Sequence, residues 1–129
     1  ISSWGQPGKT DPNRFHLPHS LVVDRDGLVY VCDRENSRVQ VFSPEGHFIT
    51  MWTDMQRPLD ISMDTEGVFY ISERPEDDKP PQISVLDREG KVLARWPSRS
   101  AHGSWVDAHG DIYLALTSEK SVDKYVRLI

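Results

Sequence analysis

Apolar and polar residues alternate along short segments of the chain. The clearest is RVQVF at residues 38–42, because an apolar residue at every second position is typical of a strand that buries one face. Similar β-type segments fill most of the sequence, and none repeats with the 3.6-residue period of an amphipathic helix. The pattern predicts an all-β protein with strands near 19–24, 28–33, 38–43, 47–53, 60–64, 68–73, 82–87 and 91–96.

Short glycine-containing segments separate these strands. DRDG, DTEG and DAHG follow the first strand of a group, and SPEG and DREG follow the third. Glycine accepts a positive φ, and a leading Asp or Ser bonds back to the turn backbone, so these segments predict hairpin turns. We therefore interpret Asp24, Asp64 and Asp107 as turn-capping residues rather than as a cluster of catalytic carboxylates.

The chain repeats itself with the period of a propeller blade. PHSLVVDRDGLVYVCD aligns with PLDISMDTEGVFYISE at an offset of 40 and with AHGSWVDAHGDIYLAL at an offset of 83. Periods in this range are typical of four-stranded β-propeller blades. ISSW at the start aligns with ITMW and LARW, which end the two complete copies. The predicted strand order is d-abcd-abcd-abc, with an orphan outer strand at 1–4, blades at 17–53 and 57–96, and a third blade at 100–129 that lacks its outer strand.

Three blades do not close a ring, because propellers have four to eight. Two copies of the chain would give six blades, with residues 1–4 of each copy pairing with the end of the other. The sequence therefore predicts a two-fold homodimer. The alternative is that the chain is a piece of a longer protein whose N-terminal half completes the ring.

The candidate functional residues fall on the end of the blades that carries the longer loops. An antiparallel meander places the tight glycine turns at one end and the other connections at the opposite end, where binding residues concentrate. His19 and His102 immediately precede the innermost strands and are predicted to point near the central axis. Asp60, Arg34 and Glu35 are further candidates for this face. The plainer interpretation of the histidines is that each bonds to backbone.

Composition and charge exclude several classes of protein. The net charge of −5 argues against nucleic acid as a partner, since binding phosphates requires a basic surface. No apolar run approaches the roughly 18 residues of a membrane span, and no signal-like segment occurs, so the sequence predicts a soluble protein of unknown compartment. Cys32 is the only cysteine, which excludes an intrachain disulfide.

The motifs resemble those of NHL-repeat propellers over essentially the whole chain. LPHSL followed by DRENSRVQVF, and the final AHGSWVDAHGDIYLAL, are similar to the peptidyl-α-hydroxyglycine α-amidating lyases. The resemblance implies a six-bladed ring whose channel holds zinc on three histidines from alternate blades, with a structural calcium nearby. His19 and His102 match two of the three zinc positions, and the third would lie outside this chain. Ser100 and Gly103 replace the expected Met and Asp, and the family's catalytic Tyr and Arg have no clear counterpart.

Doubling the chain does not supply the third histidine. In a ring of two copies the third position falls in the second blade of the other copy, where the equivalent residue is Leu59. Two imidazoles alone make a weak zinc site, since zinc takes three or four protein ligands, unless water or Asp60 completes the set. The sequence therefore favours a non-catalytic binding or assembly module whose loops around the channel bind the ligand. The alternative is a lyase-like enzyme that depends on a divalent metal, with zinc favoured over calcium.

Overall fold

The computed structural model describes residues 1–128, and its regular secondary structure is almost entirely strands. The single helical segment among these residues is a short 3₁₀ turn at Arg34–Asn36. The strands are β1 (Gln6–Pro7), β2 (Arg14–Phe15), β3 (Pro18–Val23), β4 (Val29–Asp33), β5 (Arg38–Phe42), β6 (Phe48–Trp52), β7 (Pro58–Met63), β8 (Phe69–Glu73), β9 (Gln82–Leu86), β10 (Val92–Pro97), β11 (Gly103–Val106), β12 (Ile112–Leu116) and β13 (Ser121–Tyr125). No described helix is long and apolar enough to cross a bilayer.

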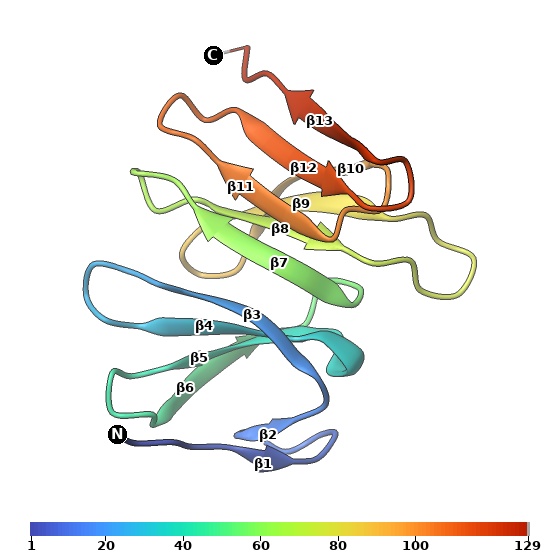
Figure 1. The fold of residues 1–129 in the computed structure, drawn as a ribbon. Helices are drawn as coiled ribbons and strands as arrows, with labels where there is room; N and C mark the ends of the chain where they lie inside the picture. The colour runs from blue at the N-terminus through green and yellow to red at the C-terminus, as the bar shows by residue number, and fades with distance from the viewer. Residues whose placement is uncertain (129) are drawn as a thin grey trace.

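The strands form three antiparallel meanders that stack side by side (Figure 1). We call β3–β6 blade 1, β7–β10 blade 2 and β11–β13 blade 3. Their first strands, β3, β7 and β11, lie next to one another and form the inner edge of the stack. This arrangement is that of a partial β-propeller, and the prediction of an all-β propeller with three blades in the chain is confirmed.

The glycine turns close the hairpins as predicted. In blade 1, Oδ1 of Asp24 accepts hydrogen bonds from the backbone N–H groups of Asp26 and Leu28, each at 2.9 Å. Oδ2 of Asp24 accepts a further bond from the Tyr30 hydroxyl at 3.0 Å. The same tyrosine bond joins Tyr70 to Asp64 and Tyr113 to Asp107. Burial, together with the bond to the carboxylate, raises the pKa of Tyr30 and Tyr70 to about 12.

The main core lies between the blades rather than within them. Phe69 is fully buried at the interface of blades 1 and 2, where its ring centroid lies 4.4 Å from Tyr30 and 5.1 Å from Trp52. Cys32 belongs to the same cluster, and burial raises the pKa of its thiol. Cys32 is therefore a small core residue, as its position in a β segment predicts. A second cluster that includes Tyr70, Ile83 and Leu114 joins blades 2 and 3.

Residues 1–4, predicted to be an orphan outer strand, form no strand within this single chain. Trp4 nevertheless occupies an outer-strand place, because its ring covers Gly46 in the β5–β6 turn just as Trp52 covers Gly90 in the β9–β10 turn. Both glycines have positive φ, and a Cβ at either would lie within 2.7 Å of the indole. The segment that follows Trp4 forms the short parallel pair β1–β2 and returns to blade 1.

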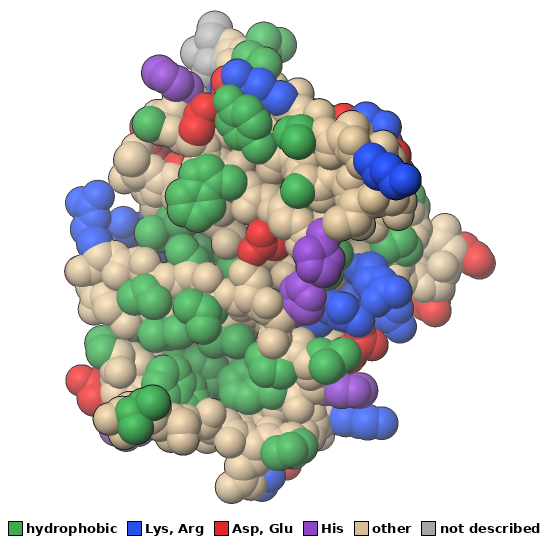
Figure 2. Space-filling view, viewed as in Figure 1, with side chains coloured by type: hydrophobic (Ala, Val, Ile, Leu, Met, Phe, Trp, Pro, Cys, Tyr) green, Lys and Arg blue, Asp and Glu red, His purple; other side chains and the backbone are tan. Residues whose placement is uncertain are grey.

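The two terminal blades expose apolar residues on their outward faces. We define the near face of blade 1 by Leu21, Val23, Val29, Val31 and Phe42, and the far face of blade 3 by Trp105, Tyr113, Ala115 and Val122. The N-terminal segment covers part of the near face, where Phe15 packs on Phe42, but Leu21 remains 57% exposed. On the far face, Trp105 is 64% and Val122 67% exposed. Figure 2 shows hydrophobic side chains gathered over blade 1.

Candidate functional site

The candidate site lies where the inner strands begin and where the strands beside them end. We call this end of the blades the channel face. Strands β3, β7 and β11 each start there, and β4, β8 and β12 each finish there. Residues at equivalent positions of the three blades therefore meet across the blade boundaries. The predicted candidates His19, Asp60, Arg34, Glu35 and His102 all lie at this end.

His19 and His102 come together although 83 positions separate them in the sequence. Their ring centroids lie 5.6 Å apart with the planes nearly perpendicular. Nδ1 of His19 donates a hydrogen bond to the Leu59 carbonyl at 2.7 Å. A neutral ring protonated at Nδ1 presents its lone pair at Nε2, the arrangement common in metal-binding histidines. The same bond also satisfies the plainer interpretation of a histidine bonded to backbone.

The residues of this chain do not fit a complete three-histidine zinc site. Leu59 occupies the equivalent position in the intervening blade 2 and offers the histidines only its backbone carbonyl. No group of three or more His, Cys, Asp or Glu side chains with metal-binding geometry occurs within residues 1–128. A complete site would therefore require a ligand from outside this chain.

Asp60 has a different environment from the one expected of a metal ligand. Its Oδ1 accepts bonds from the Ser20 hydroxyl at 2.5 Å and from the Ile61 N–H, and its Oδ2 accepts one from the Ser104 N–H at 2.7 Å. Ser20 belongs to blade 1 and Ser104 to blade 3. Asp60 thus ties the inner strands of all three blades together, and both carboxylate oxygens already have donors.

Arg34 and Glu35 follow β4 and pair with each other on the channel face. Nε of Arg34 donates to Oε1 of Glu35 at 2.8 Å, and both side chains are largely buried. This bond from Arg34 lowers the pKa of Glu35, although its partial burial opposes the shift. Nε of Arg57 lies 3.9 Å from the other carboxylate oxygen. Glu35 therefore acts as an anchor that fixes the direction of the Arg34 guanidinium.

A hollow of about 310 Å³ opens beside the histidines, and we call it the channel pocket. The residue that directly follows the second strand of each blade lines it: Arg34, Arg74 and Thr117. His102 also lines the pocket. Figure 2 shows histidine side chains in contact with each other beside a group of Lys and Arg side chains. Sequence reasoning missed Arg74, although the 40-residue offset from Arg34 is a signal that would have found it.

A second missed residue is the buried Glu73 at the end of β8. Its side chain is inaccessible to solvent and accepts hydrogen bonds from the Ser84 hydroxyl at 3.1 Å and from the Gln82 amide. The Arg95 guanidinium lies 4.0 Å away. Burial raises the pKa of Glu73 to about 7, and these partners offset only part of the effect. In blade 1 the equivalent Asp33 pairs directly with Arg38 at 2.8 Å.

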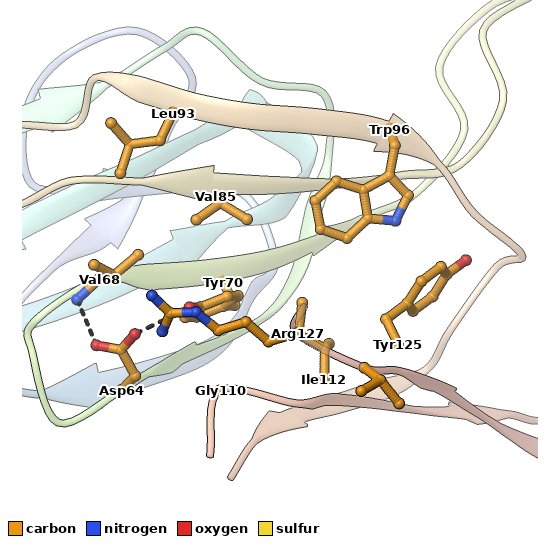
Figure 3. A pocket seen from close by; sticks show the side chains of 11 residues that line it. Asp64, Val68, Tyr70, Val85, Leu93, Trp96, Gly110, Ile112, Tyr125 and Arg127 are labelled. Atoms are coloured by element: carbon orange, nitrogen blue, oxygen red, sulfur yellow. Dashed lines mark hydrogen bonds between the residues drawn. The ribbon is translucent and has the colours of Figure 1, made fainter. Parts of the chain in front are cut away.

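A groove of about 360 Å³ separates the outer parts of blades 2 and 3 (Figure 3). Trp96 and Leu93 of β10 line one side, and Tyr125 of β13 lines the other, 5.7 Å from Trp96 between ring centroids. Trp96 in blade 2 corresponds to Trp52 in blade 1, and Trp52 covers the turn glycine Gly90 of the blade that follows it. The groove therefore lies where a fourth strand of blade 3, and its turn, would pack.

Comparisons with known proteins support the propeller. Residues 15–42 match the NHL repeat. The human NHL repeat-containing protein 3 is 33% identical over 66 residues, which cover 48% of this chain and 19% of that protein. A probable peptidyl-alpha-hydroxyglycine alpha-amidating lyase from Caenorhabditis elegans is 29% identical over 119 residues, which cover 83% of this chain and 34% of the lyase. The chain thus spans about a third or less of these relatives.

Solved structures show the same fold at low sequence identity. Hydrazine synthase from Kuenenia stuttgartiensis superposes with a TM-score of 0.72 at 14% identity, over 98% of this chain and 36% of the other. Virginiamycin B lyase from Staphylococcus aureus superposes with a TM-score of 0.64 at 9% identity, over 93% of this chain and 44% of that chain. These structures show that the fold is a partial β-propeller, and the NHL repeat matched at residues 15–42 lies in its first blade.

Proposed function

We propose that this chain is a non-catalytic binding and assembly module, in which two copies complete a six-bladed ring and the channel face binds the ligand. The observation that carries the proposal is the correspondence between the chain's open faces and its internal interfaces. Tyr113, Ala115 and Val122 on the far face of blade 3 stand at the positions of Tyr30, Cys32 and Val39 in blade 1. In blade 1 these three residues are buried against blade 2.

The near face of blade 1 matches the other half of the same interface. Leu21 and Val23 stand at the positions of Ile61 and Met63, which pack against blade 1 inside the chain. The far face of one copy and the near face of another therefore have the residue types of a blade interface. Exposed apolar surfaces of this kind mark interaction sites, and a six-bladed ring forms when two copies make this contact twice.

The edges of the sheets support the same assembly. β13 is an edge strand whose outer side has no partner within residues 1–128. Unpaired edges are templates for strand addition. Residues 1–4 carry the outer-strand sequence, and Trp4 already covers the glycine of the next blade. Pairing residues 1–4 of one copy with β13 of the other would supply the missing fourth strand beside the groove of Figure 3.

Light scattering of the purified chain at micromolar concentration tests the assembly. We expect a mass of twice 14.8 kDa. Trp105→Asp places an unpaired charge in the proposed interface, at a cost of several kcal/mol. We therefore expect the dissociation constant of the dimer to rise on the order of 100-fold. Ile49→Asp is the matched control, because Ile49 is also an exposed apolar residue but lies on neither open face.

A well-folded monomer at these concentrations would contradict the homodimer. It would favour the alternative in which a further N-terminal half completes the ring. Equal dissociation of the Trp105→Asp and Ile49→Asp variants would also contradict the interface, because only the former changes the far face.

A second candidate function is a lyase-like enzyme that depends on a divalent metal. The observation in its favour is the contact between His19 and His102, which would hold zinc together with a ligand from elsewhere. The likeness of the chain to a probable amidating lyase also supports it. The departures at Ser100 and Gly103, and Leu59 at the third position, favour the non-catalytic module.

Elemental analysis of the dialysed protein separates the two candidates. The binding module is expected to carry no stoichiometric zinc or calcium, because two imidazoles are too few ligands for a tight zinc site. Near-stoichiometric zinc that His102→Ala removes, and that His109→Ala leaves in place, would overturn this expectation. His109 is the matched control because it is exposed in the β11–β12 turn, away from His19.

A further inference from the structure

The polar side chains that line the channel pocket share one property: each can donate a hydrogen bond. Two are guanidinium groups, Arg34 and Arg74, one is the His102 imidazole, and the others are the hydroxyls of Ser100, Thr117 and Ser118. No carboxylate lines the pocket. The chain as a whole has 20 acidic and 15 basic residues, so a lining without acids is the reverse of its general composition.

The two arginines are held differently. The bond between Nε of Arg34 and Glu35 fixes the guanidinium plane and leaves the terminal nitrogens available. Arg74 has no carboxylate within 4.0 Å among the described residues, and its backbone N–H is bonded to the Arg57 carbonyl at 2.9 Å. Arg34 is largely buried but already paired with Glu35, whereas Arg74 is exposed and has no such partner, so the space that they border carries net positive charge and favours an anion.

We propose that the channel pocket binds an oxyanion, a carboxylate or a phosphate group, through Arg34 and Arg74. Guanidinium groups bind planar carboxylate and phosphate oxygens through charge-assisted, often paired, hydrogen bonds. The hydroxyls of Thr117 and Ser118 and the His102 ring provide further donors around the same hollow. This inference rests on the proposed function, because it assigns the chemical class of the ligand that the channel face binds.

The position of the pocket explains why the donors gather there. The same repeat position, directly after the second strand of a blade, is occupied by Arg34, Arg74 and Thr117 in blades 1, 2 and 3. Because equivalent positions of the blades lie side by side, all three residues reach the channel. In a six-bladed ring of two copies, the same register would place two such pockets on one face. Within one chain the pocket already contains residues of all three blades, so binding of the anion does not require the second copy.

Isothermal titration of the full chain with inorganic phosphate, and separately with acetate, tests the inference at constant ionic strength. We expect saturable binding of at least one of them, and the tighter of the two identifies the oxyanion group. Arg74→Gln is expected to weaken that binding at least tenfold. Arg25→Gln is the matched control, since Arg25 is an exposed arginine in the opposite, glycine-turn end of blade 1 and bonds only to the Thr65 carbonyl.

The results separate the anion site from the assembly. If the chain has the mass of a dimer and neither phosphate nor acetate binds above a sodium chloride control, the anion site is wrong and the assembly stands. If Arg74→Gln and Arg25→Gln weaken binding equally, the anion is held by general charge and the pocket assignment is overturned. If a monomeric chain binds phosphate or acetate and Arg74→Gln alone abolishes binding, the site is supported and the homodimer is wrong.

Discussion

Phe69→Ala is expected to lower the free energy of unfolding by about 4 kcal/mol. Phe69 is fully buried and its ring contacts both Tyr30 and Trp52 of the neighbouring blade. Removing the ring leaves a cavity at the interface of blades 1 and 2, where few side chains are free to collapse because the strands on both sides are hydrogen-bonded. Urea unfolding followed by tryptophan fluorescence measures the loss.

Phe48→Ala is the matched control for this prediction. Phe48 is also a phenylalanine in a strand, but it is only partly buried and its ring meets a single aromatic neighbour, Phe42, at 6.1 Å. We expect it to cost less than half as much. Equal losses for the two variants would mean that the boundary between blades 1 and 2 contributes no more to stability than the edge of blade 1.

Glu73→Gln is expected to change how stability depends on pH. Burial raises the pKa of Glu73 from 4.5 to about 7 in the folded protein. Below pH 4.5 the carboxyl is protonated in both states, so its contribution to folding is fully present. As the pH rises toward 7 only the unfolded state ionises, and stability is lost. A shift of this size corresponds to on the order of 3 kcal/mol.

The measurement is the free energy of unfolding of both proteins between pH 4 and 9. The unsubstituted protein should lose stability relative to Glu73→Gln as the pH rises through this window, with no further relative loss above about pH 8. Glu89→Gln, which removes an exposed glutamate in the β9–β10 turn, controls for the change in net charge. Parallel curves for the protein and the Glu73→Gln variant would show that Arg95, Gln82 and Ser84 compensate the buried charge fully.

The repeat made most of the fold predictable. Strand positions, hairpin turns and the meeting of His19 with His102 all follow from residues that recur at a fixed offset, because equivalent residues occupy equivalent places in each blade. Arg74 is the residue equivalent to Arg34 at the 40-residue offset. That step needs only the sequence, and it would have revealed the basic lining of the channel pocket.

The features that could not be predicted depend on residues without an equivalent in the repeat. Residues 5–17 have no second copy, so their path over blade 1 and the β1–β2 pair had no precedent in the chain. The sequence made Asp60 a candidate ligand, because its hydrogen-bond partners Ser20 and Ser104 lie 40 and 44 positions away and serine itself gives no signal. Glu73 follows Ser72 at the polar end of a β-type segment, and a polar strand end predicts exposure to solvent rather than burial.

The contact between each outer-strand tryptophan and the turn glycine of the next blade restricts how the length of this chain can change. Trp52 must reach Gly90, and Trp4 must reach Gly46, with too little room for even a methyl group. An insertion in an outer strand, or in the turn that holds the glycine, would move the indole away from the glycine that it covers. The four extra residues of the second copy fall instead in the connection between β8 and β9, outside the outer strands and their turns. Lengthening by whole blades, or at such connections, is therefore the growth that this architecture tolerates.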